Sequence, residues 1–154
     1  MTRTHTYRVD LEWTGDGGMP GFVGYDRDHV VVARGRPPIL GSSDPAFLGS
    51  RDRWNPEHLL VASIAQCHLL WYLHLACWSG VVVHSYRDAP EGYLIESDDG
   101  GGRFERVVLH PVVRVRHESM VEAAQAAHGR VGELCFIARS LNFPVYHEPV
   151  VEVD

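Results

Sequence analysis

Two cysteines lie on two predicted helices, and a pair of thiols can support redox chemistry. Cys67 lies in a strongly apolar stretch, and Cys135 lies near the end of the second helix. Thiols on crossing helices can meet, so that one sulfur attacks a peroxide and the other resolves the oxidised product. A thiol-based peroxidase needs this arrangement. A free cysteine on an apolar helix is, alternatively, just a small buried hydrophobe.

Small residues stand near both cysteines at helical spacing. Gly132 lies three residues before Cys135, Gly129 lies one turn earlier, and Ser63 stands four residues before Cys67. A glycine inside a helix costs roughly 1 kcal/mol relative to alanine. We interpret these small residues as room for a close helix crossing that brings the thiols together. Ordinary close packing of two helices is the alternative.

A thiol that reacts near neutral pH needs a positive neighbour. The residues within one helical turn of Cys67 include no cation, so its activation must come from elsewhere. Arg51 and Arg53, in the loop before the helix, are the candidates. Arg139, four residues after Cys135, either lowers the pKa of that thiol or opposes the helix dipole.

A second arrangement of possible ligands occurs at the end of the first helix. His74 and Cys77 stand three residues apart on one helix face, and both types of side chain bind zinc. Two ligands do not make a site, and the other histidines that we considered are scattered: His58, His84 and His147. We therefore expect neither a metal ion nor a cofactor.

The first helix is predicted over residues 56–78. Asn55 is a favourable N-cap, Pro56 suits the first helical position, and Ser79-Gly80 ends the helix. Glu57 either stabilises the positive helix end or orients an arginine through a bidentate pair. The helix is apolar nearly all round, which is typical of complete burial or of a membrane span. Because polar residues interrupt it and basic flanks are missing, we predict burial by a partner subunit in a homodimer, with no membrane.

The second helix is predicted to open with a capping box at Ser119-x-x-Glu122, and Pro144 limits its continuation. The segment 35–54 reads as a long loop, and turns at 15–18 and 20–21 end the first strand. Alternating or apolar runs predict the strands, which are 5–13, 28–33, 81–87, 92–96, 104–117 and 145–153. This order, with strands joined largely by hairpins, predicts an α+β fold.

Length and composition restrict the class of protein. A chain of 154 residues fits a single domain over 1–154. The formal net charge of −6 provides no basic field for nucleic acid or an anionic membrane. The first residues lack a signal-peptide core, and three cysteines do not describe a secreted disulfide framework. We expect a cytoplasmic protein with reduced thiols.

Two segments together resemble a known family. The run Asn-Pro-Glu-x-Leu-Leu-x-Ala-x-x-x-x-Cys at 55–67 resembles the OsmC/Ohr family of thiol-dependent hydroperoxidases. The segment Cys-Phe-Ile-Ala-Arg-Ser at 135–140 resembles the second cysteine helix of that family. The resemblance implies an intertwined α+β homodimer, with antiparallel sheets, two long central helices per subunit and active sites at the subunit interface.

The resemblance also implies roles for individual residues. Cys67 would be the peroxidatic thiol, Cys135 the resolving thiol and Glu57 the carboxylate that orients a catalytic arginine. One branch of the family carries this arginine ten residues before the glutamate, where this chain has Phe47. Phe136 follows the second cysteine, where the best-studied branches have proline.

The leading hypothesis is therefore a two-cysteine peroxidase that reduces organic hydroperoxides at the expense of a dithiol reductant. Apolar residues expected near Cys67 favour an alkyl or fatty-acyl hydroperoxide over hydrogen peroxide: Phe47, Leu70, Trp71 and Phe136. The first alternative is a non-enzymatic protein that binds a hydrophobic ligand at its dimer interface. The second is a structural dimer with inert core cysteines.

Overall fold

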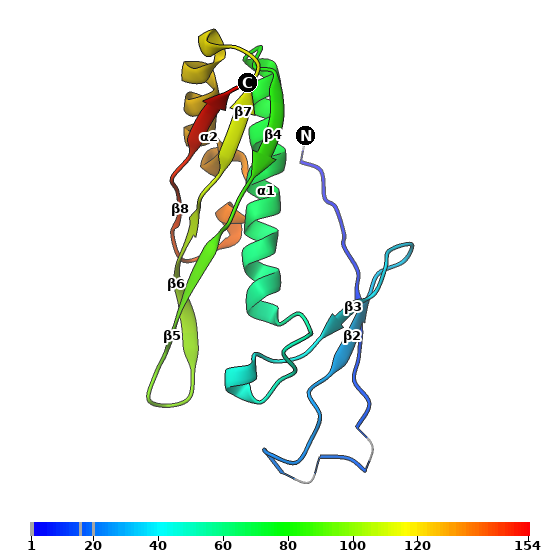
Figure 1. The fold of residues 1–154 in the computed structure, drawn as a ribbon. Helices are drawn as coiled ribbons and strands as arrows, with labels where there is room; N and C mark the ends of the chain where they lie inside the picture. Colours follow the sequence, from blue (N-terminus) through cyan, green and yellow to red (C-terminus); the bar gives the residue numbers. More distant parts are fainter. Residues whose placement is uncertain (1, 16, 20) are drawn as a thin grey trace. The chain divides into compact units, whose positions relative to one another are not determined.

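The chain is represented by a computed structural model, which describes residues 2–15, 17–19 and 21–154. It consists of two compact units, Met1–Leu59 and Leu60–Asp154, and each is described by itself. Figure 1 shows the elements along the chain, coloured from blue at the N-terminus to red at the C-terminus. Asp16 and Pro20, which belong to the predicted turns, lie outside the described residues.

A three-stranded antiparallel sheet is the regular part of the first unit. Its strands, in spatial order, are β1 (Asp10–Glu12), β2 (His29–Val32) and β3 (Ile39–Gly41). β3 lies within the segment predicted as a loop, because its pairing with β2 supplies hydrogen bonds that no local pattern reveals. The same segment holds a short 3-10 turn, η1 (Pro45–Phe47), where the Asp44 carboxylate accepts a hydrogen bond from the Ala46 N–H.

The first helix, α1, spans Pro56–Trp78, as the sequence predicts. The Asn55 side-chain oxygen accepts a 2.7 Å hydrogen bond from the His58 N–H, which confirms the predicted N-cap. Gly80, with a φ of 72°, follows the helix in the left-handed conformation that suits glycine. Within the chain, α1 buries one face, formed by Ile64, His68, Tyr72, Leu75 and Ala76.

The described residues include one helix, α1, whose length and composition would let it cross a membrane, and only 28% of its apolar window is buried. A core helix of a soluble protein passes the same test, so this property is weak evidence for a membrane span. Leu70 and Trp78 on this helix are 66% and 68% exposed. The helix therefore presents apolar side chains that the rest of the chain leaves uncovered.

Two three-stranded sheets complete the β structure of the second unit. One has the order β4 (Val83–Arg87), β7 (Val112–Val115), β9 (Val150–Val153), and the other β5 (Glu91–Glu96), β6 (Gly102–Leu109), β8 (Val145–His147). β4–β7 and β5–β6 are antiparallel, whereas β6–β8 and β7–β9 are parallel. The two sheets of this unit are thus mixed: the predicted antiparallel pairing is present in β4–β7 and β5–β6, as in the sheet of the first unit, but β8 and β9 add parallel pairs.

Two predicted strands are each divided by a proline. The strand predicted at 104–117 is interrupted at Pro111, and the strand predicted at 145–153 is interrupted at Pro149. Proline has no N–H and cannot donate to a sheet ladder. The chain therefore changes sheets at each of these prolines, so that β6 and β8 pair in one sheet while β7 and β9 pair in the other.

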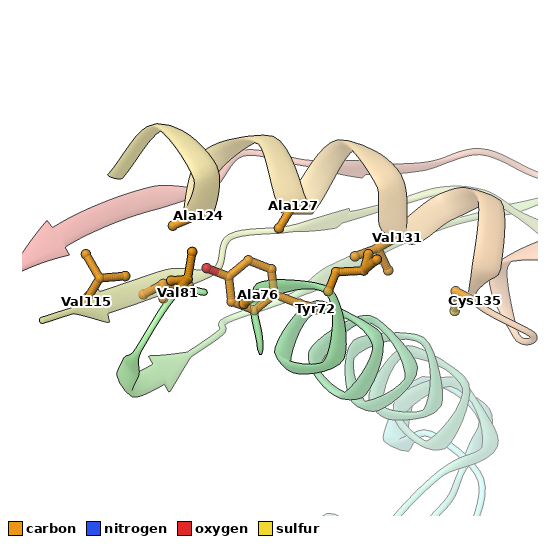
Figure 2. Close-up of a cluster of buried hydrophobic side chains, with 10 residues drawn as sticks. Tyr72, Ala76, Val81, Val115, Ala124, Ala127, Val131 and Cys135 are labelled. Atoms are coloured by element: carbon orange, nitrogen blue, oxygen red, sulfur yellow. The ribbon is translucent and has the colours of Figure 1, made fainter. Parts of the chain in front are cut away.

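The second helix, α2, spans Val121–Leu134 and follows a short 3-10 turn, η2 (Glu118–Met120). The predicted capping box is wrong: Ser119 lies inside the 3-10 turn, and Met120 is the N-cap and makes no side-chain capping bond. Figure 2 shows the α2 side chains of Ala124, Ala127 and Val131 directed toward α1 and β7, with Cys135 just beyond the helix end. Small side chains at these positions let α2 pack closely in the core.

Candidate functional site

The structure brings Cys67 of α1 and Cys135, the residue after α2, into contact. Both belong to one hydrophobic cluster, in which Cys135 is only 2% exposed and Cys67 is half-buried. Burial, followed by a hydrogen bond with the Cys67 thiol, raises the pKa of Cys135 to about 11. The two thiols thus lie close together, and Cys135 stays protonated near neutral pH.

Arg139 does not lower the pKa of Cys135. It is exposed in a 3-10 turn, η3 (Ala138–Ser140), and the pKa of the thiol is raised rather than lowered. The Ala138 N–H donates a hydrogen bond to the Cys135 sulfur over 3.4 Å. One alternative from the sequence, activation of Cys135 by Arg139, is therefore wrong.

The glycines of α2 leave open space instead of admitting another backbone. A Cβ atom added at Gly129 or Gly132 would meet no atom within 4 Å, so the predicted close approach at these glycines is wrong. Both glycines border a cavity of about 260 Å³ in the second unit. Its other lining residues are Ile64, His68, Val131, Cys135, Ala138, Phe143, Pro144, Val145 and His147.

Three histidines meet beside this cavity, and we call them the histidine cluster: His68 on α1, His128 on α2 and His147 on β8. His68 Nε2 and His128 Nδ1 share a hydrogen bond of 3.0 Å. The His147 ring lies 5.5 Å from the His68 ring and 6.1 Å from the His128 ring, measured between centroids. The buried Tyr72 ring stacks on His128 with a centroid distance of 4.0 Å.

Burial keeps the histidine cluster uncharged. It lowers the pKa of His68 to about 4 and that of His128 to about 3, and it also lowers the pKa of His147. The neighbouring imidazoles contribute further to the shifts at His68 and His128. At neutral pH all three rings are therefore neutral, and each has one nitrogen that can accept a proton.

Sequence reasoning missed the histidine cluster as a feature. It placed His128 on the apolar face of α2, which the burial of this residue confirms, but treated it as an ordinary core position. A usable signal was present, since His68 directly follows Cys67 and His128 shares a helix face with Cys135. His147 comes from a strand far along the chain, and only the fold brings it to the other two.

The other predicted site residues belong to the first unit. Arg53 forms an ion pair with Asp28, with Nε and Oδ2 2.6 Å apart, and Arg51 is exposed. Asp28 also accepts a hydrogen bond from the Ser50 hydroxyl, and this bond is the main reason why its pKa is lowered. Glu57 lies in the first turn of α1, and its Oε2 atom is buried without a hydrogen-bond partner among the described residues.

The possible zinc ligands at the end of α1 are exposed. His74 contacts the rings of Trp71 and Trp78, and Cys77 is a free thiol at the surface. Across the described ranges, no group of three or more histidine, cysteine or acidic side chains is arranged to hold a metal ion. The contact between Cys67 and Cys135 beside the histidine cluster is therefore the best candidate for a reactive site in the described part of the chain.

Comparisons with known proteins identify the fold. Residues 49–148 match the family of OsmC-like proteins. An OsmC-like protein of unknown function from Vibrio cholerae is similar in structure, with a TM-score of 0.84 and 27% identity over 96% of this chain and 100% of that chain. No curated protein sequence matches the chain.

Two more distant structures share the fold. An organic hydroperoxide resistance protein from Elizabethkingia anophelis has a TM-score of 0.67 and 17% identity, over 97% of this chain and 99% of its own. An organic hydroperoxide resistance protein OsmC from Legionella pneumophila has a TM-score of 0.64 and 17% identity, with the same coverage. With the family match extending over residues 49–148, these similarities establish that the chain belongs to the OsmC-like family.

Proposed function

We propose that this protein is a thiol-dependent peroxidase that reduces organic hydroperoxides. The contact between the Cys67 and Cys135 thiols is the observation that carries this proposal. Cys67 is the more accessible of the two, so it is the sulfur that meets the peroxide, and the buried Cys135 acts second. Structural neighbours described as organic hydroperoxide resistance proteins are consistent with this chemistry.

The reaction proceeds in three steps. The Cys67 thiolate attacks the terminal peroxide oxygen, the O–O bond breaks, and the products are a Cys67 sulfenic acid and an alkoxide that takes up a proton. The Cys135 thiol then displaces hydroxide from this sulfenic acid, which gives a Cys67–Cys135 disulfide and water. A dithiol reductant finally restores both thiols by thiol–disulfide exchange.

The surroundings of the cysteines favour an apolar substrate. Trp71 and Phe136 meet edge to face with ring centroids 5.7 Å apart, and Phe136 is 70% exposed. Leu70, on the same helix as Cys67, is 66% exposed. Apolar side chains that remain open to solvent bind an alkyl chain better than they bind hydrogen peroxide. We infer that organic hydroperoxides are reduced in preference to hydrogen peroxide.

One experiment tests the disulfide directly. The reduced protein is treated with one equivalent of cumene hydroperoxide in the absence of reductant, and its peptides are analysed by mass spectrometry. We expect a Cys67–Cys135 disulfide, and catalytic consumption of peroxide once dithiothreitol is added. If no disulfide forms and a co-purifying apolar ligand is found, the non-enzymatic ligand-binding function replaces the peroxidase.

We also infer that the protein is a homodimer. The alternating side chains of Tyr7, Val9 and Leu11 are 89%, 65% and 67% exposed, and Leu70 and Trp78 of α1 are equally uncovered. Exposed apolar area on this scale is typical of a surface that binds another chain. Sedimentation of the dilute protein should give about twice 17.3 kDa. A folded monomer across the micromolar range would contradict this inference.

Arg51 and Arg53 remain our candidates for activating Cys67. Replacing the correct arginine by methionine should reduce the thiolate fraction of Cys67 and slow its alkylation near pH 7 by roughly 3- to 10-fold. Because Arg53 is paired with Asp28, the Asp28→Asn variant is the matched control, which breaks the same ion pair but keeps the cation. If neither arginine variant alters the rate, the assignment is wrong, and Arg34 and Arg36 are tested next.

A further inference from the structure

The mechanism leaves one requirement unmet, which is the removal of a proton from Cys135. Its pKa of about 11 means that only about one molecule in 10⁴ carries the thiolate at pH 7. The groups that shift this pKa are the burial itself, the Cys67 thiol and backbone N–H groups, and no cation is among them. A nearby base is therefore needed if Cys135 is to act as a nucleophile at neutral pH.

The cavity beside Cys135 supplies candidate bases. Among the side chains that line it, only those of His68 and His147 carry a nitrogen or oxygen atom. When the His68 Nε2–H donates to His128 Nδ1, the Nδ1 atom of His68 is unprotonated and can accept a proton. His147 also borders a second groove, on the surface beside Arg106 and Glu148, and so lies between the inner cavity and that groove.

We propose that the histidine cluster carries the proton of Cys135 during formation of the Cys67–Cys135 bond. This inference rests on the proposed function. His68 and His147 face the thiol cavity, and His128 orients His68 through their hydrogen bond. The imidazoles of His68 and His128 are costly to bury at an apolar helix crossing, and the buried Nε2 atom of His128 has no hydrogen-bond partner among the described residues.

Formation of the Cys67–Cys135 bond is the attack of a thiol on a sulfenic acid. The S–H bond of Cys135 and the S–O bond of the Cys67 sulfenic acid break, and an S–S bond forms. The Cys135 sulfur is oxidised and the Cys67 sulfur is reduced, while the imidazole passes the thiol proton to the departing hydroxide, which leaves as water. Because burial disfavours the imidazolium form, the cluster releases the proton rather than storing it.

The titratable groups around the cluster are few. Tyr72 faces His128 from α1, and Cys67 and Cys135 lie at the thiol end. The surface groove beside His147 is bordered by Arg106, Tyr146 and Glu148. Burial raises the pKa of Tyr72 to about 12, so this phenol stays neutral over the whole working range. The neutral imidazoles are thus the groups in the cluster that can relay the thiol proton near pH 7 without remaining protonated.

The test uses a disulfide probe instead of a peroxide. In a Cys77→Ser background, which removes the exposed thiol, 4,4′-dithiodipyridine forms a mixed disulfide with Cys67. Attack by Cys135 then releases a second thiopyridone, and stopped-flow absorbance follows this second phase. We expect His68→Gln and His147→Gln to slow the second phase roughly 10- to 100-fold at pH 7. His117→Gln, an exposed histidine outside the cluster, is the control and should leave the rate unchanged.

The pH dependence of the second-phase rate distinguishes a role of the histidines in proton transfer from a purely structural role. In the two glutamine variants the second phase should rise about tenfold per pH unit toward pH 10, as hydroxide replaces the missing base. The rate of the second phase in the wild-type protein should rise less steeply with pH, so the difference in rate between wild type and the variants becomes smaller at high pH. Slowing by the same factor at every pH, or rates within about twofold of wild type at pH 7, would overturn the proposal. His147 is half-buried on a strand, so its variant is the one expected to fold if His68→Gln does not.

The two proposals fail in different ways. If the protein reduces no peroxide but the second phase still depends on the histidines, the proposed function is wrong and the proton transfer stands. If peroxide turnover depends on both cysteines but the rate of the second phase is the same in the histidine variants as in wild type, the proposed proton transfer is wrong and the peroxidase function is retained.

Discussion

Cys67→Ser is expected to lower the turnover of an organic hydroperoxide by roughly 10³-fold or more, which corresponds to about 4 kcal/mol of transition-state stabilisation. A serine hydroxyl is almost fully protonated near neutral pH and does not replace a thiolate as the nucleophile. The measurement is the consumption of cumene hydroperoxide with dithiothreitol as the reductant, at pH 7 and at matched protein concentrations.

Two further variants make this result specific. Cys77→Ser changes the exposed thiol at the end of α1 and should leave turnover unchanged. Cys135→Ser should still form a sulfenic acid on Cys67, which dimedone traps, but it cannot form the intramolecular disulfide. Equal turnover by wild type and Cys67→Ser would contradict the peroxidase function and favour the alternative in which both cysteines are inert core residues.

The free energy of unfolding should fall by roughly 4 kcal/mol between pH 6.5 and pH 4.5, a large share of the stability of a domain this size. His68 and His128 have folded-state pKa values of about 4 and about 3, well below their usual value of 6.5. As the pH falls below 6.5, these two histidines bind protons in the unfolded chain but remain unprotonated in the folded chain, so acid favours unfolding. Urea unfolding followed by circular dichroism measures this dependence.

Histidine variants identify the source of the pH dependence. His128→Gln removes one of the two buried imidazoles. The free energy of unfolding of this variant should therefore fall by only about half as much between pH 6.5 and pH 4.5, whatever its value at pH 7. His117→Gln removes an exposed histidine and should retain the full decrease. Carboxylates with shifted pKa values, such as Asp28 and Asp88, are present in wild type and in both variants. Their contribution to the pH dependence is therefore the same in all three proteins. A free energy of unfolding that is flat over this range would contradict the burial of neutral histidines.

The boundaries of α1 were predictable because the signals that set them are local. Asn55 caps the helix through its own side chain, Pro56 suits the first turn, and Gly80 adopts the left-handed conformation after the last turn. The second helix shows the limit of such signals. Ser119 and Glu122 match a capping box, but the chain forms a 3-10 turn at 118–120 and the serine becomes part of it.

By itself, the sequence determined the position of Cys67 on α1 and the family, since both depend on short contiguous runs such as 55–67. Tertiary structure alone decided which face of α1 is buried, because a helix that is apolar all round has no intrinsic preference. It also decided the parallel pairing of β8 and β9 and the meeting of His68, His128 and His147. Those three histidines lie on three elements far apart in the chain, and their shared burial, which sets their pKa values, exists only once these elements have packed together.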